Sequence, residues 1–276
     1  MMSLMNVKRV VAVLALLGAF FGVPEARAAD VTGCVRGLAD AAPPAHFMRV
    51  AAWQRNVPAD KLKVTYIGHS SFLLETPGGT SIVTDFNGAH QAPYVPDIVT
   101  MNGSHDSHYT EFVPPEVTHV LRGWEPEGGV ARRELKFKDV EIYNLPTNFD
   151  RPFGDASNIN SIFDFKAAHL CVAHLSHLGH LLSRDQRRRI RRIDVLFLNI
   201  DGNYLSHPEA FKLIEQIGPR VVIPMHYHFG GAVSAFNAGA AENNYSVREA
   251  AGSTVLFSDT TLPRSTEILY LQPQDY

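Results

Sequence analysis

From Lys61 onward, short apolar runs rich in β-branched residues alternate with turn residues, and this pattern limits the fold more than any other feature. Residues 183–193 and 206–218 are the two expected helices, because Ser183 and Ser206 each begin a capping box. Strands are expected at 64–67, 71–75, 81–86, 98–101, 119–121, 140–143, 161–165, 169–173, 195–200, 221–224, 254–257 and 268–271. Strands dominate first and helices alternate with them later, which predicts one α/β domain over residues 61–276.

The N-terminus has the pattern of an export signal. Lys8 and Arg9 precede an uncharged apolar run at 10–23, and Ala26-Arg27-Ala28 has the small residues of a signal-peptidase site. The run has 14 residues, which is short for a membrane span. We therefore expect a signal peptide at 1–28, an N-terminal extension at 29–60 and a periplasmic or secreted protein. A lipoprotein box ending at Cys34 is an alternative, although charged residues separate it from the apolar run.

Charge and cysteine content narrow the possible partners. Without residues 1–28 the chain carries 22 basic and 27 acidic residues, which argues against nucleic acid as a partner. The two cysteines, Cys34 and Cys171, could form a disulfide in an oxidising compartment, or Cys171 is simply a small buried residue.

Five arginines lie within 187–192. A solvated helix is the main interpretation of this run, and contact with an anionic lipid surface is the secondary one.

Histidines gather at the ends of predicted strands. Seven of the 13 lie in three short segments, at residues 104–108, 174–180 and 225–228. Imidazole is the most common transition-metal ligand, and strand-end loops can bring ligands from several segments together. A single histidine is more often a surface or core residue than a ligand, but three such segments favour a metal site.

These segments resemble the metallo-β-lactamase-fold hydrolases, in particular the branch with ascorbate-phosphate lactonases and N-acyl-phosphatidylethanolamine phospholipases. The motif Y-I-G-H-S-S-F at 66–72 is similar to the family's W-L-G-H-x-S-F, and I-V-T-D at 82–85 is similar to I-L-x-D-P. Residues 99–108 stand in the place of T-H-x-H-x-D-H, residues 173–180 in that of x-H-L-G-D-L-G-H, and 222–227 match V-I-P-M-H-Y. The resemblance implies an αββα sandwich and metal-dependent hydrolysis.

The departures from the family motifs imply a changed metal centre. Gly103 and Ser107 stand where the first metal loop has a histidine and the aspartate, and Asn148 stands in place of the next histidine. His177 occupies the position of the aspartate that bridges two metals in relatives. The inherited metal positions therefore carry four imidazoles and no carboxylate, at His105, His108, His177 and His226. They predict one Zn²⁺, or a similar divalent metal, per chain.

Other polar residues near these motifs have two interpretations each. Asp106 could be a general base or could point to solvent, and Asp201 could orient a ligand imidazole, take a proton or simply shape a turn. Supporting roles around the metal are expected for His69, Asn148, His174 and His180.

Together these features predict an exported zinc hydrolase that uses metal-activated water on an ester, lactone or phosphodiester in a small-molecule or lipid-like substrate. The alternative is a catalytically silent protein that binds a metal or ligand on the same fold.

Overall fold

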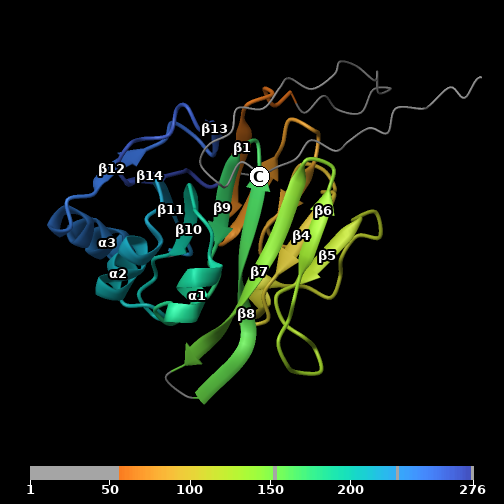
Figure 1. Ribbon diagram of the computed structural model, residues 1–276, viewed down its shortest axis with the longest axis horizontal. Helices are drawn as coiled ribbons and strands as arrows, with labels where there is room; N and C mark the ends of the chain where they lie inside the picture. Colours follow the sequence, from red (N-terminus) through yellow and green to blue (C-terminus); the bar gives the residue numbers. More distant parts are fainter. Residues whose placement is uncertain (1–55, 152–153, 228–229, 275–276) are drawn as a thin grey trace, which may run out of the picture.

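The structure is a computed structural model that describes residues 56–151, 154–227 and 230–274. The predicted signal peptide, Cys34 and nearly all of the predicted extension lie outside the described residues. The described chain forms two β-sheets packed face to face (Figure 1). The expected α/β fold with two sheets is therefore confirmed.

The first sheet has six strands in the order β13-β1-β2-β3-β4-β5. Strands β1, β2 and β3 are antiparallel neighbours, and β4 and β5 run parallel to β3. Gly79 has φ 75° in the turn between β2 and β3, a conformation that glycine adopts without strain. The strand bounds are β1 (Leu62–Gly68), β2 (Ser71–Glu75), β3 (Ser81–Val83), β4 (Ile98–Met101), β5 (His119–Arg122) and β13 (Thr254–Phe257).

The second sheet has eight strands in the order β12-β14-β11-β10-β9-β8-β7-β6. Strands β9, β10, β11, β14 and β12 are parallel, so the C-terminal ends of β9, β10 and β11 meet at one edge. The bounds are β6 (Glu134–Phe137), β7 (Val140–Arg151), β8 (Gly154–Ala167), β9 (Leu170–His174), β10 (Val195–Asn199), β11 (Val221–Met225), β12 (Ser246–Glu249) and β14 (Glu267–Tyr270).

The described helices are α1 (Arg184–Arg189), α2 (His207–Ile217), α3 (Gly230–Glu242) and the 3₁₀ helix η1 (Asp106–His108). Both predicted capping boxes are present, at Ser183 and Ser206, and α2 ends at Gly218 with φ 66°. Helix α1 ends earlier than predicted because Ile190 has an extended backbone. No helix in the described ranges is long and apolar enough to cross a membrane.

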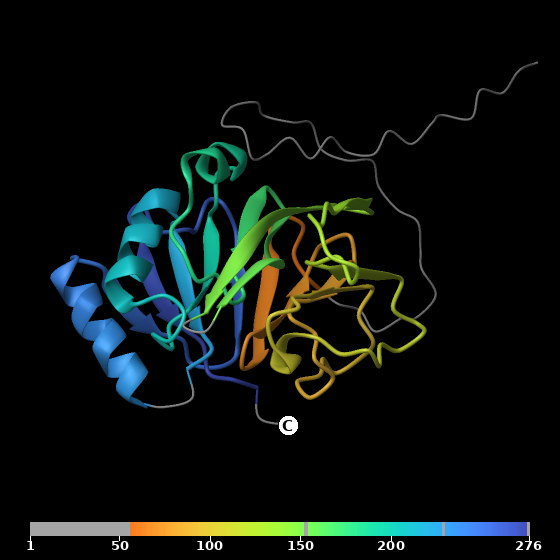
Figure 2. The ribbon, with the colours of Figure 1, turned by 90° about the horizontal axis from the view of Figure 1, so that it is seen from below.

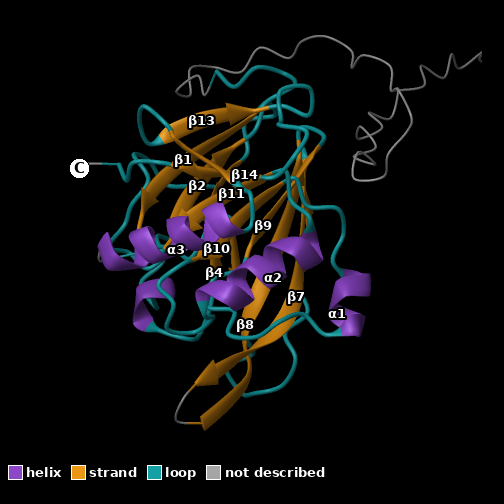
Figure 3. Ribbon diagram, turned by 90° about the vertical axis from the view of Figure 1, so that its left-hand side faces the viewer, coloured by secondary structure: helices purple, strands orange, loops and turns teal. Residues whose placement is uncertain are grey.

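Three apolar layers hold the molecule together. The first lies between the sheets and includes Phe72 and Phe197, whose rings stack at 4.0 Å. The second lies between the second sheet and its helices and includes Phe211 and Phe236. The third lies on the outer face of the first sheet, where loops rather than long helices cover Val99. Figures 2 and 3 show α2 and α3 side by side over the second sheet. Polar residues of the candidate site lie in the segments that follow β1, β4, β9 and β11.

Candidate metal centre

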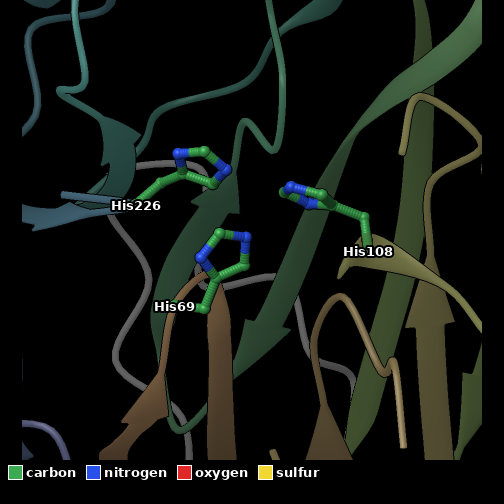
Figure 4. Close-up of side chains that lie close together, drawn as sticks. All are labelled: His69, His108 and His226. Atoms are coloured by element: carbon green, nitrogen blue, oxygen red, sulfur yellow. The ribbon is translucent and has the colours of Figure 1, made fainter. Parts of the chain in front are cut away.

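Three imidazoles converge where the two sheets meet at their strand ends. His69 lies in the turn between β1 and β2, His108 ends η1, and His226 directly follows β11. Their candidate ligand atoms all lie within 4.8 Å of one another (Figure 4). Three imidazoles from three segments, two of them buried and one partly buried, are a donor set that suits a transition metal.

Unusual backbone geometry directs two of these rings into the cluster. His69 and His226 have φ 53° and 58°, which non-glycine residues adopt rarely. The amide of His226 donates to the carbonyl of His69 at 2.8 Å, and the Tyr66 hydroxyl donates to the same carbonyl at 2.8 Å. These hydrogen bonds stabilise both strained residues and connect the first sheet to the second.

A buried carboxylate orients His108. Asp85 is fully buried and contacts Nδ1 of His108, and it also accepts hydrogen bonds from Ser176 Oγ at 2.7 Å and Asn102 Nδ2 at 3.1 Å. Burial opposes its ionisation, but the His174 and His108 imidazoles and the hydrogen bonds from His108 and Ser176 outweigh burial and lower the pKa of Asp85 to about 2. Because an ionised carboxylate can only accept hydrogen bonds, the proton between Asp85 and His108 is carried by Nδ1 of His108.

The surroundings of the other ring nitrogen of His108, Nε2, show whether a metal would fit at the cluster. His108 Nε2 is buried and has no hydrogen-bond partner among the described residues. Because Nδ1 carries the proton, Nε2 is left with a free lone pair. Buried polar atoms normally have a partner, so an unpaired nitrogen facing two other imidazoles fits a metal ligand.

His226 is oriented in the same way by Asp201. Asp201 Oδ2 lies 3.1 Å from Nδ1 of His226. Burial disfavours the ionised carboxylate, but hydrogen bonds from His226 and from the backbone of Asn203 lower the pKa of Asp201. The other nitrogen of His226, Nε2, faces the neighbouring imidazoles and lies 2.9 Å from Nε2 of His177.

His177 lies beside the three rings rather than among them. Its Nε2 is 2.9 Å from Nε2 of His226, its Nδ1 is 3.1 Å from Ser104 Oγ, and the Tyr204 ring packs on it at 4.4 Å. Burial, reinforced by the neighbouring imidazoles, lowers the pKa of His177, which keeps the ring neutral. A neutral imidazole at this place can act as a fourth ligand.

Two residues named from the sequence face solvent. His105, expected as a ligand, has a side chain 55% exposed, and its Nδ1 lies 2.8 Å from Asp106 Oδ1. Asp106, expected as a possible base, is 86% exposed. The structure therefore does not bring His105 into the cluster, because the residue has an extended backbone as the N-cap of η1.

The expected supporting residues lie in the loops around the cluster. Buried His174 contacts the carbonyl of Ser70 through Nε2 at 2.8 Å. Nε2 of His180 accepts from the backbone amide of exposed Asn148 at 3.2 Å. These contacts order the loops and include no contact with the three clustered rings. His69 is the exception, since the structure places it in the cluster itself.

Gly103, which stands where the family motif has its first histidine, packs against an aromatic ring. A Cβ added at Gly103 would lie 2.9 Å from Cδ2 of Trp124. A histidine at 103 would therefore require the Trp124 ring to move. Neither Gly103 nor exposed Asn148 offers an imidazole at its motif position.

A pocket of about 550 Å³ opens over the cluster. Its lining consists of His69, Asn87, Ala89, His90, His105, Asp106, Ser107, His177, Tyr204 and His226. Four further residues at the site were not expected from the sequence: Asp85, Ser104, Ser176 and Tyr204. For Asp85 a signal was available, since it ends the family-like segment at 82–85.

Comparison with known proteins agrees with this architecture. A family model described as a beta-lactamase superfamily domain matches residues 63–226. A UPF0173 metal-dependent hydrolase of Carboxydothermus hydrogenoformans is 23% identical over 200 residues, covering 63% of this chain and 88% of the relative. A UPF0173 protein of Pyrococcus abyssi is 21% identical over 200 residues, covering 63% and 89%.

Solved structures share the fold. One from Thermotoga maritima, described as a Zn-dependent hydrolase of the metallo-β-lactamase superfamily, has a TM-score of 0.56 at 22% identity. It covers 76% of this chain and 98% of its own length. Igni18, a metallo hydrolase of Ignicoccus hospitalis, has a TM-score of 0.51 at 18% identity and covers 72% and 99%. At these identities the likeness concerns the fold.

Proposed function

Because this chain belongs to the metallo-β-lactamase superfamily, with a domain match over residues 63–226, we propose that it is a metal-dependent hydrolase. The observation that carries the proposal is the cluster of His69, His108 and His226 below an open pocket, with His108 Nε2 buried and unpaired. Relatives described as metal-dependent hydrolases support the reaction class.

The proposed metal is one zinc ion, or a similar divalent ion, per chain. Neutral imidazoles suit zinc, and His177 would be the fourth ligand or would leave that position to water or substrate. When bound, such a metal supplies Lewis acidity, which activates water at neutral pH and polarises a substrate oxygen. The Trp124 ring packed against Gly103 supports a single metal position rather than two.

Three carboxylates have different roles at the site: Asp85 and Asp201 orient the imidazoles, and Asp106 exchanges protons. Asp85 and Asp201 hold the Nδ1 protons of His108 and His226, which fixes the tautomers of both rings. Asp201 also accepts from the amide of Asn203 at 2.8 Å and is therefore already engaged. Asp106, an exposed carboxylate in the pocket wall, is the group left to exchange protons with the substrate or solvent.

The experiment is metal analysis of the purified chain, followed by assays on ester, lactone and phosphodiester probes. We expect about one zinc per chain after desalting, the stoichiometry of a single tetrahedral site. We also expect hydrolysis that a chelator abolishes and zinc restores. Tight metal binding without turnover would instead favour the alternative of a silent metal-binding protein. Failure to bind any divalent metal would contradict the hydrolase proposal and leave only a silent ligand-binding protein.

We further propose that the chain is exported and acts in the periplasm or outside the cell on a small-molecule or lipid-like substrate. The charged start, the apolar run at 10–23 and Ala26-Arg27-Ala28 support cleavage after Ala28. Intact-mass measurement of the envelope fraction should give a chain that begins at Ala29. A full-length cytoplasmic product would contradict export and leave the hydrolase proposal standing.

A further inference from the structure

Helix α1 contributes almost nothing to the apolar core. None of its residues is buried, and four of its six positions, Arg184, Arg187, Arg188 and Arg189, are arginine. Its attachment is polar: the Ser183 capping box begins it, and Gln186 donates to the carbonyl of Pro146 at 3.5 Å. The helix is therefore held at the surface by these hydrogen bonds and by the apolar residues that flank it, Leu182 and Ile190, while none of its own side chains is buried.

Helical geometry gives α1 one strongly basic side. Arg184, Arg187 and Arg188 are spaced i, i+3 and i+4, so they share a face, and Gln186, which contacts the protein, lies on the opposite side. We call these three residues the arginine face. All three are exposed. Figure 3 shows α1 at the edge of the molecule, apart from α2 and α3.

The charge of the arginine face is only partly offset. Arg188 pairs with Asp185 at 3.4 Å, and both side chains are more than half exposed, which makes the pair weak. Arg187 donates one N–H to the carbonyl of Leu182 at 2.8 Å, and its other guanidinium N–H groups have no hydrogen bond among the described residues. Within the described ranges, Arg184 has no ion pair.

This concentration of charge is local. The nine residues 184–192 contain six arginines and one aspartate, whereas the whole chain has a formal charge of −3. The neighbouring pocket of about 140 Å³ is lined by Arg189 and Arg191 and not by the arginine face. A convex, outward helix with no pocket of its own suits an extended anionic surface better than a small ligand.

We propose that the arginine face docks the protein on a bilayer surface rich in anionic phospholipid. Guanidinium groups bind phosphate oxygens in planar, bidentate geometry and are weakly hydrated, which favours arginine at such a contact. The acidic remainder of the chain is repelled by the same surface and would orient the molecule with α1 toward the lipid. The inference does not depend on the proposed hydrolase activity.

The test is cosedimentation of the full chain with vesicles of phosphatidylcholine mixed with phosphatidylglycerol, and with vesicles of phosphatidylcholine alone. The key variant combines Arg184→Gln, Arg187→Gln and Arg188→Gln. A matched variant combines Arg132→Gln, Lys212→Gln and Arg264→Gln, three exposed cations outside α1, and changes the net charge equally. Circular dichroism establishes that both variants fold.

We expect binding only to the anionic vesicles, weakened by salt. Loss of three guanidiniums at about fivefold each should reduce the partition coefficient about a hundredfold, whereas the matched variant should bind much more tightly than the key variant. Equal loss in both variants, or no binding by the wild type, would overturn the proposal. Tighter binding to duplex DNA than to the anionic vesicles would overturn it in favour of nucleic acid.

Discussion

At the scale of single residues, the three clustered imidazoles differ in the group that fixes their orientation. A buried carboxylate, Asp85, contacts His108, and Asp201 contacts His226, whereas Nε2 of His69 lies 2.9 Å from the hydroxyl of Ser107. A carboxylate behind an imidazole makes it a better metal ligand than a hydroxyl does, because it stabilises positive charge on the ring. His108 and His226 are therefore expected to dominate the affinity, with His69 completing the set.

Single substitutions should separate the clustered rings from the exposed one. We expect His108→Ala, His226→Ala and His69→Ala each to weaken zinc binding at least tenfold, since each removes one donor of a small set. His105→Ala is the matched control, and it should leave zinc affinity nearly unchanged because its ring faces solvent. Competition titration with a chromophoric chelator measures the affinities. A large loss in His105→Ala with none in His69→Ala would contradict this placement.

Asp164 should make stability depend on pH. Burial, reinforced by Asp194 and opposed by Arg191 and Lys166, raises the pKa of Asp164 from 3.8 to about 7. The folded state therefore holds a proton that the unfolded state has lost, so this residue costs stability as pH rises from about 4 to 7, by up to about 4 kcal/mol. We expect Asp164→Asn to stabilise the protein at pH 8 relative to wild type, and much less at pH 4, in urea unfolding. An equal effect at both pH values would contradict the raised pKa.

The sequence could name the segments of the site but not the direction of each side chain. His108 and His226 were expected as ligands and His69 as a support, and all three lie together. His105 was expected beside His108, but the start of η1 sets its backbone extended and turns the ring outward. That turn depends on hydrogen bonds from distant loops, such as Asn87 to the carbonyl of Ser107, which no local pattern contains.

At the scale of elements, helices were predicted where the pattern was amphipathic and missed where it was not. Helix α2 has one apolar side and a capping box, and its observed bounds, His207–Ile217, agree closely with the predicted helix at 206–218. Helix α3, rich in glycine and alanine, has no such side and was not predicted. Strand β7 ends at Arg151 and strand β8 begins at Gly154, so both are much longer than the predicted strands at 140–143 and 161–165. Their pairing with each other stabilises polar residues that favour loops locally.

The contact between α2 and α3 depends on one glycine. A Cβ at Gly239 would lie 2.4 Å from Cε2 of Phe211, a ring packed on Phe236 in the core. Overpacking of this kind costs about 1–3 kcal/mol, more than the helix propensity gained from alanine. We expect Gly239→Ala to destabilise the protein in urea unfolding. Gly231→Ala in the same helix is the control, since nothing lies within 4 Å, and it should be neutral or stabilising by up to about 1 kcal/mol. Equal changes in the free energy of unfolding for Gly239→Ala and Gly231→Ala would contradict the close contact between Gly239 and Phe211.

At the scale of the whole molecule, the candidate metal centre connects the two sheets. His69 and His108 belong to loops of the first sheet, and His226 follows β11 of the second. Without a metal, the sheets are held by the apolar layer between them, with a direct link at the site through the His226 amide and the His69 carbonyl. A metal bound by all three rings would add a connection between the sheets that exists only in the folded state.

Metal binding should therefore stabilise the entire fold and not only the loops. A ligand that binds only the folded state at a hundred times its Kd adds about 2.7 kcal/mol. For a domain of this size that corresponds to a rise in Tm of roughly 5–10 °C. We expect zinc to raise the Tm of the metal-free wild type by this amount in a calorimetric scan. The far-UV (β-sheet) and near-UV (aromatic) circular dichroism signals should be lost at the same temperature. His226→Ala removes the ligand that follows β11 of the second sheet, so its Tm should respond much less to zinc than that of the wild type. A full zinc response in His226→Ala would show that the stabilising metal binds elsewhere.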